Sequence, residues 1–294
     1  MYANSGAYKP PTNELTMNDN VGQTTFFYSR HPISADIILA KLQAAHGHLR
    51  DVRPEELWAH DQDHYGGLAV NDALAEAAGI AAGARVADFC AGLGGPARYL
   101  AHRYGADVTG IELTPARVEG AARLTALVGL EDRVRVLHGD VMAPPLDDGS
   151  MDAVVSQEAF LHVPDKAQTL ASARRVLRPG GHLAFTDWVA HRPLSSDDAA
   201  LMWEGMAVQP LRDIPAYRAL VEGAGFTVDL VTDLSEEWKA VLRERLAMYQ
   251  RLRGEAERAG TPQGHDAFHR SYIRFVALIE EGALGGVRIG AKRP

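Results

Sequence analysis

The segment from residue 85 to residue 100 limits the fold of this chain more than any other stretch. It reads Arg-Val-Ala-Asp-Phe-Cys-Ala-Gly-Leu-Gly-Gly-Pro-Ala-Arg-Tyr-Leu: a short apolar strand, a glycine-rich turn, and a helix that starts at about Pro96. This order is typical of the first strand–helix unit of a nucleotide-binding α/β sheet. Gly92, Gly94 and Gly95 have no Cβ, so the backbone can turn tightly there and come close to a ligand.

Asp88, at the end of that strand, limits the kind of ligand that the turn can bind. A carboxylate at this point repels a pyrophosphate, whereas it can hold an ammonium group or hydroxyls. The turn itself, residues 88–95, contains no Lys or Arg that would offset the negative charge. We therefore expect a ligand that carries positive charge.

Composition limits the remaining functions. With 294 residues, 46% of them apolar and 23% charged, the chain is typical of a soluble globular protein of one large domain or two small ones. The formal net charge of −8 argues against nucleic acid as a partner. No apolar run approaches the roughly 20 residues that span a bilayer, and the first residues resemble no secretion or import signal. The single cysteine, Cys90, excludes an internal disulfide. We expect a cytoplasmic protein without a membrane partner.

The middle of the chain alternates strands and helices, as a parallel sheet requires. We expect strands at 85–89, 107–111, 134–137, 151–156 and 183–186, helices at 96–104, 115–128 and 166–177, and a tight Arg-Pro-Gly-Gly turn at 178–181. With two further strands, this predicts a Rossmann-like α/β fold: a seven-stranded, mostly parallel sheet flanked by helices. Each crossover should be right-handed.

The two ends of the chain are expected to add helices to this sheet. The predicted division is a flexible tail at 1–24, an N-terminal helical cover at 25–80, a cofactor-binding core at 81–191, and a helical insertion with the last part of the sheet at 192–294. The cover should have helices at 33–45, 54–59 and 70–78. The last part should have helices at 195–208, 214–224, 235–258 and 266–281, a strand at 227–231, and an antiparallel strand at the sheet edge at 287–291. The helix at 235–258 leaves a homodimer open.

Three further polar residues follow strand ends and should meet Asp88 at one edge of the sheet, where open α/β sheets bind ligands. Glu112, 20 residues after Gly92, is placed to hold two ribose hydroxyls. Asp140, followed by Val141, is placed to accept the exocyclic amine of an adenine, and Gln157 reaches the same edge. Carboxylates in this pattern favour S-adenosylmethionine. The alternatives are solvated strand ends, or a nicotinamide dinucleotide bound by Gly92-x-Gly94-x-x-Ala97, against which Asp88 counts.

Over about residues 65–191, the chain resembles the class I S-adenosylmethionine-dependent methyltransferases. Asp88-Phe-Cys-Ala-Gly92-Leu-Gly94 matches their Asp-x-Gly-x-Gly-x-Gly turn, except that Cys90 replaces the first glycine. The backbone at Cys90 must therefore tolerate a Cβ. Its thiol is either a contact to the methionine end of the cofactor or a small buried group beside the turn.

A narrower resemblance lies at Ser156-Gln-Glu-Ala-Phe-Leu-His162-Val-Pro-Asp-Lys166, which is similar to a segment of the sarcosine/dimethylglycine and phosphoethanolamine N-methyltransferases. In the phosphoethanolamine branch, the histidine pairs with a tyrosine of the N-terminal extension. The resemblance implies that His162 and Tyr65 are catalytic, with Tyr28 the second choice for the tyrosine. His162 is either a general base or an organiser of the pocket.

Substrate contacts should come from the cover and the insertion. The candidates are aromatic residues for cation–π contact with a methylated ammonium, a methionine, and an arginine for a carboxylate or phosphate: Tyr28, Trp188, Trp203, Met206, Arg245 and Tyr249. The cluster His60, Asp61, Asp63 and His64 is interpreted as a polar lid without a metal.

Together these features predict an S-adenosylmethionine-dependent methyltransferase that acts on a small molecule, at the nitrogen of an amine such as sarcosine or dimethylglycine. One alternative is an O- or C-methyltransferase of a specialised metabolite, which a deep apolar pocket under the insertion would favour. Another is a nucleoside-binding module without catalysis.

Overall fold

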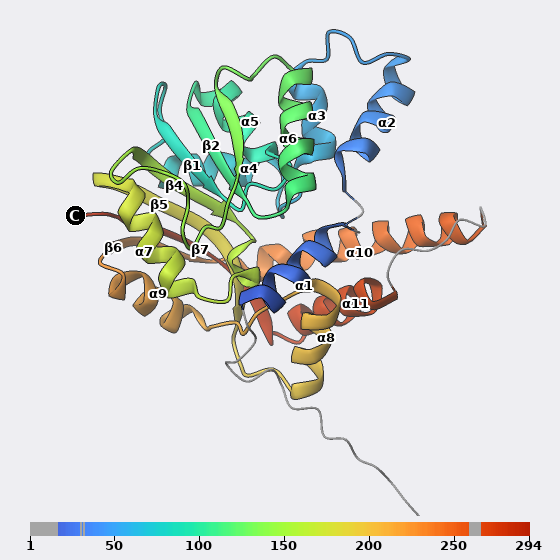
Figure 1. Ribbon diagram of the computed structural model, residues 1–294. Helices are drawn as coiled ribbons and strands as arrows, with labels where there is room; N and C mark the ends of the chain where they lie inside the picture. The colour runs from blue at the N-terminus through green and yellow to red at the C-terminus, as the bar shows by residue number, and fades with distance from the viewer. Residues whose placement is uncertain (1–16, 30, 32, 259–265) are drawn as a thin grey trace, which may run out of the picture.

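The computed structural model describes residues 17–29, 31, 33–258 and 266–294, which form one seven-stranded sheet with helices on both faces (Figure 1). The strand order is β3-β2-β1-β4-β5-β7-β6. β7 is antiparallel to both of its neighbours, and the other pairs are parallel. The strands are β1 (Arg85–Phe89), β2 (Asp107–Glu112), β3 (Val134–His138), β4 (Met151–Gln157), β5 (Leu177–Ala190), β6 (Thr227–Asp233) and β7 (Leu284–Lys292). The predicted Rossmann-like fold is confirmed.

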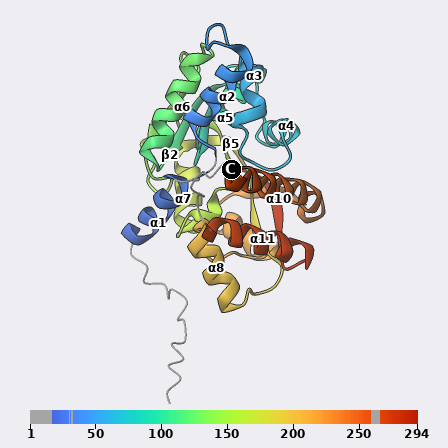
Figure 2. The same ribbon diagram turned by 90° about the vertical axis from the view of Figure 1, so that its right-hand side faces the viewer.

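Helices lie at both ends of the molecule and between them. Figure 2 shows α2, α3 and α6 toward the top of the view, α8 and α11 toward the bottom, and α10 between them. The helices are α1 (Met17–Ser29), α2 (Ala35–His46), α3 (Pro54–Asp61), α4 (Leu68–Ala77), α5 (Gly95–Tyr104), α6 (Pro115–Leu127), the 3₁₀ turn η1 (Phe160–His162), α7 (Lys166–Val176), α8 (Ser196–Met206), α9 (Ile214–Gly223), α10 (Ser235–Arg258) and α11 (Asp266–Glu280). The predicted helices lie within a few residues of these bounds.

The predicted flexible tail is wrong for residues 17–24, which belong to α1, while residues 1–16 lie outside the described residues. The sequence of α1 is rich in Asn, Thr and Gly, which favour helices weakly. Tertiary hydrogen bonds hold it instead: the Asn20 amide donates to the His162 carbonyl (3.3 Å), and the Gln23 amide donates to that of Trp203 (3.2 Å). These hydrogen bonds join residues far apart in the chain, so the local sequence pattern cannot predict them. The boundaries between cover, core and insertion stay a prediction.

Strand β5 extends beyond the predicted strand at both ends, and the turn expected before it at 178–181 lies within it. Leu177 pairs with Met151, and the next partners are His182 and Ala153, so the extra β5 residues form a bulge. Gly180 has a φ of 78° and donates to the Arg293 carbonyl (2.8 Å), which keeps the bulge in the sheet. Glycine allows this left-handed conformation at little cost.

The last strand, β7, was expected at the sheet edge and lies inside the sheet, between β5 and β6. Its residues are almost all buried, whereas those of β6 are mostly exposed or half-exposed. The apolar strand therefore takes the interior position, and the more polar β6 forms the edge.

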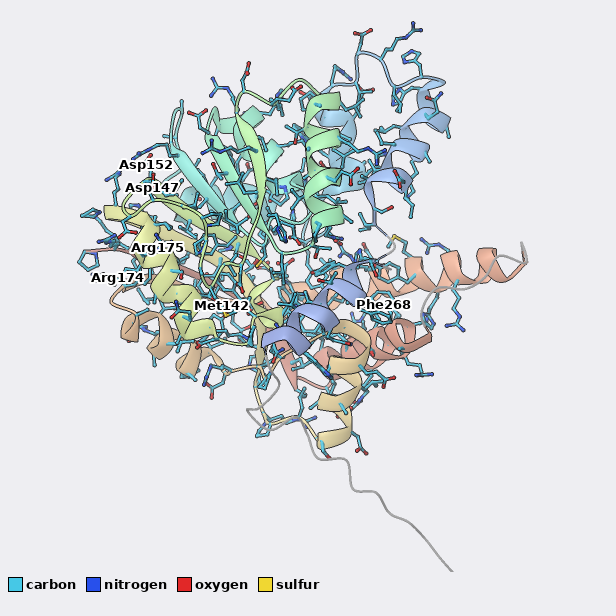
Figure 3. The ribbon with its side chains drawn as sticks, viewed as in Figure 1. Met142, Asp147, Asp152, Arg174, Arg175 and Phe268 are labelled. Carbon is cyan, nitrogen blue, oxygen red and sulfur yellow. The ribbon has the colours of Figure 1, made fainter. Side chains whose placement is uncertain are left out.

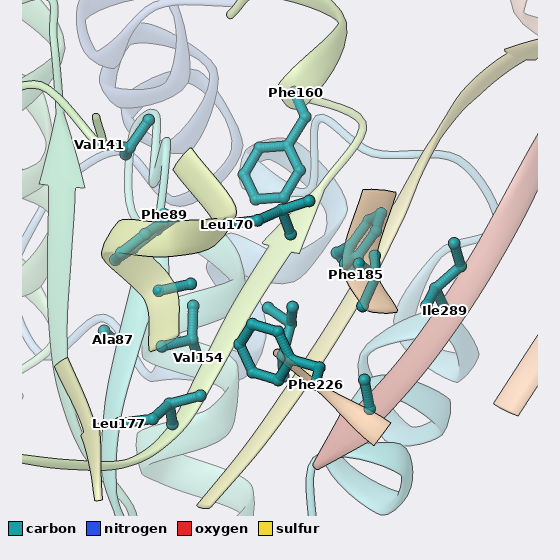
Figure 4. Packing of buried hydrophobic residues seen from close by; sticks show 14 of the residues in the cluster. Ala87, Phe89, Val141, Val154, Phe160, Leu170, Leu177, Phe185, Phe226 and Ile289 are labelled. Carbon is teal, nitrogen blue, oxygen red and sulfur yellow. The ribbon is translucent and has the colours of Figure 1, made fainter. Parts of the chain in front are cut away.

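Phe185, at the centre of β5, anchors the core between the sheet and α7 and α9 (Figure 4). Its ring centroid lies 5.2 Å from that of Phe160 in η1 and 5.3 Å from that of Tyr217 in α9. Phe185 is fully buried. The turn that carries His162 is therefore packed directly against the sheet.

We expect Phe185→Ala to lower the free energy of unfolding by about 3–5 kcal/mol, because it removes a buried ring and leaves a cavity. Urea unfolding followed by circular dichroism measures this change. The matched control is Leu230→Ala on edge strand β6, where Leu230 is 36% exposed, with an expected change within about 0.5 kcal/mol. Similar losses for both variants would contradict this account of the core.

Candidate active site

The glycine-rich turn after β1 uses three left-handed residues to double back over the sheet edge. Cys90, Gly92 and Gly94 have φ values of 62°, 56° and 75°. Left-handed backbone costs a non-glycine residue roughly 1–2 kcal/mol, so Cys90 does tolerate a Cβ there, at a cost. Gly95 has a second requirement, since a Cβ on it would lie 2.1 Å from the Asp61 carbonyl oxygen.

Glu112, at the end of β2, fixes the shape of this turn. Its Oε2 accepts from the Gly92 backbone N–H (2.9 Å), and its Oε1 accepts from that of Thr114 (2.8 Å). Both carboxylate oxygens are thereby oriented by the backbone and keep lone pairs for a ligand. The side chain is only 6% exposed.

A cavity of about 1,120 Å³, partly open to solvent, lies over this edge of the sheet. Most of the residues predicted to bind the cofactor line it together: Asp88, Cys90, Gly92, Glu112, Asp140, Val141 and Gln157. Gly94 is outside the lining and serves as the left-handed cap of α5. Met142, which also lines this cavity, lies beside α7 (Figure 3), where its carbonyl accepts from the Ser172 hydroxyl (2.7 Å).

Asp88 is a buried acid of this first cavity. It is 4% exposed, and its Oδ2 has no hydrogen-bond partner among the described residues. Burial, with a smaller contribution from Glu112, raises the pKa of Asp88 to about 7. Burial also raises the pKa of the Cys90 thiol well above its usual range, so this thiol is protonated and a poor nucleophile.

Sequence reasoning missed Arg117 of α6, which brings a basic group to a turn expected to have none. A Cβ on Gly92 would lie 2.9 Å from its NH1 atom. The guanidinium lies 4.2 Å from the centroid of the Tyr28 ring and donates to Asp63 Oδ2 (3.3 Å). Its charge is therefore offset by Asp63. The local sequence pattern of residues 115–127 does not predict that Arg117 reaches this turn.

A second cavity, of about 510 Å³, adjoins the first and is walled mainly by aromatic residues. Tyr28, Asp63, Glu158 and His162 line both cavities. Most of the other lining residues are aromatic: Phe27, Tyr65, Trp188, Tyr249, Phe268 and Tyr272. Phe268 of α11 (Figure 3) lies 6.0 Å from the Phe27 ring of α1 and 5.5 Å from the Tyr249 ring of α10. Three helices thus close this second cavity.

His162 pairs with Tyr28, and the expected pairing with Tyr65 is wrong. The Tyr28 hydroxyl lies 2.9 Å from His162 Nε2, and the Ala207 carbonyl lies 3.2 Å from Nδ1. Because a carbonyl only accepts, Nδ1 carries the proton and Nε2 accepts from Tyr28. Burial lowers the pKa of His162 to about 4, so the ring is neutral at pH 7.

Asp187 of β5 fixes the turn that carries His162. Its Oδ1 accepts from the Leu161 N–H (3.0 Å), and its Oδ2 accepts from the Tyr217 hydroxyl (2.9 Å). The hydrogen bonds tie η1 to the sheet and to α9.

Tyr65 contributes its backbone to the junction between the cavities. Its N–H donates to Glu158 Oε2 (2.8 Å), while its ring packs 4.9 Å from that of Trp238. The ring is confined there because α10 covers it, which is why it does not reach His162.

Glu158 follows β4 directly and is one of two carboxylates at the junction, the other being Asp63. It has a φ of 43° and also accepts from the Thr186 hydroxyl (2.7 Å). Burial raises the pKa of Glu158 to about 7. No ion pair of the described residues includes it. The predicted motif contained Glu158, but only the tertiary structure shows where it lies.

The remaining substrate candidates divide. Trp188, Met206, Arg245 and Tyr249 line the second cavity, whereas Trp203 lines neither. Trp188 stacks on Phe275 at 3.7 Å.

Within the described residues, no cluster of His, Cys, Asp and Glu could hold a metal ion. Of the predicted polar lid, Asp61 is buried, where its carboxylate pairs with Arg98 (2.9 Å). It is therefore part of the interior and not of a surface lid.

Comparison with known proteins identifies the family of this chain. Residues 87–185 match the family model described as a methyltransferase domain. A "27-O-demethylrifamycin SV methyltransferase" of Amycolatopsis mediterranei is 30% identical over 229 residues, 76% of this chain and 83% of its own length. A "Sarcosine/dimethylglycine N-methyltransferase" of Halorhodospira halochloris is 40% identical over 128 residues, 44% of this chain and 43% of its own. The chain matches other curated relatives over less than two thirds of their length.

Among solved structures, phosphoethanolamine N-methyltransferase 2 of Haemonchus contortus, in complex with phosphomonomethylethanolamine and S-adenosylhomocysteine, has a TM-score of 0.69 at 20% identity. The match covers 89% of this chain and 60% of that one. In the described residues, no helix is both long enough and apolar enough to cross a membrane. The chain belongs to the S-adenosylmethionine-dependent methyltransferases.

Proposed function

We propose that the first cavity binds S-adenosylmethionine through those of the predicted residues that line it. The unpartnered Asp88 Oδ2 and Gln157 Oε1 are acceptors in its lining, which fits a ligand with an ammonium group. Glu112 would hold the ribose hydroxyls, and Asp140 would accept from the adenine amine. The bound cofactor supplies a methyl group that is already activated by its sulfonium.

We propose further that the acceptor lies in the second cavity and that the methylated atom is the nitrogen of a small amine. Glu158 carries this proposal, because it is a partly buried carboxylate at the junction of the two cavities without an ionic partner in the described part of the chain. An ammonium group would offset its charge. The aromatic walls favour a cation as well.

The proton-transfer energies also favour nitrogen. An alkylammonium with a pKa near that of lysine, about 10, must lose a proton before its nitrogen can attack. Transfer from it to Glu158, whose pKa is about 7, is uphill by about 4 kcal/mol. An aliphatic hydroxyl, with a pKa close to the value of about 16 for water, would need about three times as much. Glu158 is therefore an adequate base for an amine and a poor one for an alcohol.

His162 is suited to organise the junction instead of accepting the proton. Its lone pair at Nε2 is taken by the Tyr28 hydroxyl, and its lowered pKa makes it a weak base. His162 and Tyr28 together fix the lining at the junction of the two cavities. In the proposed reaction, this lining holds the reacting groups in line and excludes water.

A phenol is the second candidate acceptor. Its pKa of about 10 is equal to that of an amine for this purpose, and the aromatic lining of the second cavity offers stacking partners for a phenol ring. Arg245 does not decide between them, because its guanidinium donates to the carbonyls of Asp63 (3.0 Å) and His64 (2.9 Å).

The raised pKa of Asp88 predicts that cofactor affinity depends on pH. Without ligand, Asp88 takes up a proton as the pH falls through about 7, whereas an ammonium beside it keeps it ionised. Binding must then release a proton, so affinity for S-adenosylhomocysteine is full above about pH 7 and falls up to tenfold per unit below it. Calorimetry from about pH 5.5 to about 8.5 measures this slope.

The variant Asp88→Asn should bind more weakly at pH 8 and lose the slope. Asp140→Asn, which removes a carboxylate from the same cavity, should weaken binding and keep the slope. A wild-type affinity that is constant across this range would contradict the role assigned to Asp88.

We expect Glu158→Gln to lower kcat about 10²- to 10³-fold, as loss of a general base does, and to leave S-adenosylhomocysteine affinity within about twofold of wild type. The wild-type kcat/KM should rise with pH through about 7, where Glu158 of the free enzyme loses its proton, and the variant should lack that rise. A screen of sarcosine, dimethylglycine and simple phenols identifies the acceptor. Tyr28→Phe is the comparison variant, with a smaller loss and the pH rise retained. Full activity of Glu158→Gln would overturn the assignment.

A further inference from the structure

A chain of side-chain hydrogen bonds runs from a buried ion pair into the first cavity. It begins at Asp61, whose Oδ2 accepts from Arg98 (2.9 Å) and whose Oδ1 accepts from the Gln62 amide nitrogen (2.8 Å). A carboxylate paired with an arginine only accepts hydrogen bonds. Gln62 must therefore turn its NH₂ group toward Asp61 and its Oε1 away from it.

Each following link has its direction set by the one before. Gln62 Oε1 accepts from the Asn71 amide nitrogen (2.8 Å) and from His64 Nε2 (2.9 Å). Asn71 Oδ1 then accepts from the Gln157 amide nitrogen (3.0 Å). The end of the chain is Gln157 Oε1, which is buried, has no partner among the described residues, and belongs to a residue that lines the first cavity.

This end lies on the same side of the sheet as Asp88. In the parallel register, Asp88 is opposite Val155, and Gln157 follows two residues later on the same face of β4. Asp88 Oδ2 is likewise unpartnered in the described part of the chain. Two acceptors therefore meet at the first cavity.

We infer that this relay, from Arg98 and Asp61 through Gln62 and Asn71, orients Gln157 so that its oxygen accepts a hydrogen bond from the α-ammonium group of S-adenosylmethionine. Asn71 and Gln62 are positioning residues that do not touch the cofactor. The two amide orientations of a glutamine have nearly the same shape, and the wrong one would present an NH₂ group to a cation. This inference rests on the proposed binding of S-adenosylmethionine in the first cavity and does not depend on which substrate is methylated.

The test measures binding of two ligands by calorimetry without any acceptor. S-adenosylhomocysteine carries the ammonium group, and 5′-methylthioadenosine keeps the nucleoside and the sulfur without the amino-acid part. Asn71→Leu should weaken the first about tenfold, the effect of one hydrogen bond to a charged group, and change the second by less than about twofold. Thr125→Val, which removes another partner of Arg98 (3.2 Å), should change neither.

A second background separates orientation from packing. Gln157→Glu presents an oxygen to the cavity in either orientation, so Asn71→Leu combined with it should cause less than about a twofold further loss of S-adenosylhomocysteine affinity. Equal losses for both ligands, or an equal loss in both backgrounds, would overturn the relay and leave Asn71 a packing residue.

Asn71 is fully buried, so its variant is paired with one at a more accessible link. Gln62→Met removes the acceptor that orients Asn71 and should reproduce the selective loss of S-adenosylhomocysteine affinity. Wild-type affinity of Gln62→Met for both ligands would also overturn the inference. These binding experiments contain no methyl-accepting substrate. A negative result would therefore contradict the relay without bearing on the proposal of an amine substrate.

Discussion

Acidic groups taken out of water at the carboxyl end of the sheet are the constraint on which the rest of this site depends. Removing a carboxylate from water costs several kcal/mol, and hydrogen bonds from backbone N–H groups offset part of this cost for Glu112 and Glu158. Glu112 receives two such bonds, and Glu158 receives one together with a hydroxyl. Asp88 Oδ2 receives none among the described residues. This edge of the sheet therefore has a buried carboxylate oxygen that a cationic ligand could contact. Such a site suits the proposed cofactor and the proposed amine substrate.

Three arginines from three helices meet one short loop, residues 61–64, and thereby join the cover to the sheet. Arg98 of α5 pairs with the Asp61 carboxylate, Arg117 of α6 with that of Asp63, and Arg245 of α10 with two backbone carbonyls. Removing one partner of the fully buried Asp61–Arg98 pair would leave an uncompensated charge, at about 3–5 kcal/mol. Asp63 of this loop lines both cavities, so the loop fixes the position of the first cavity relative to the second.

Local sequence was sufficient for the sheet and for one half of the site. Strands β1, β2 and β4 are each followed by a helix before the next strand, and the turn after β1 has residues that few other structures require, so Asp88, Glu112, Asp140 and Gln157 could be placed at one edge. The second cavity could not be predicted in this way. Its walls come from α1, α10 and α11, and whether Tyr28 or Tyr65 reaches His162 depends on how α10 packs over Tyr65. Arg117 and Asn71 also act only through residues distant in sequence.

Burial has opposite effects on the pKa values of Glu158 and His162 at the junction, and this difference suits them to different roles. Because burial disfavours whichever form is charged, it raises the pKa of Glu158 to about 7 and lowers that of His162 to about 4. At neutral pH, Glu158 therefore exchanges a proton readily, while His162 stays a neutral ring with a fixed tautomer. A protonated His162 would no longer accept the hydrogen bond from the Tyr28 hydroxyl, and its charge would repel a cationic substrate. The same low-dielectric environment thus favours the Glu158 carboxylate over the His162 imidazole as the base that we propose.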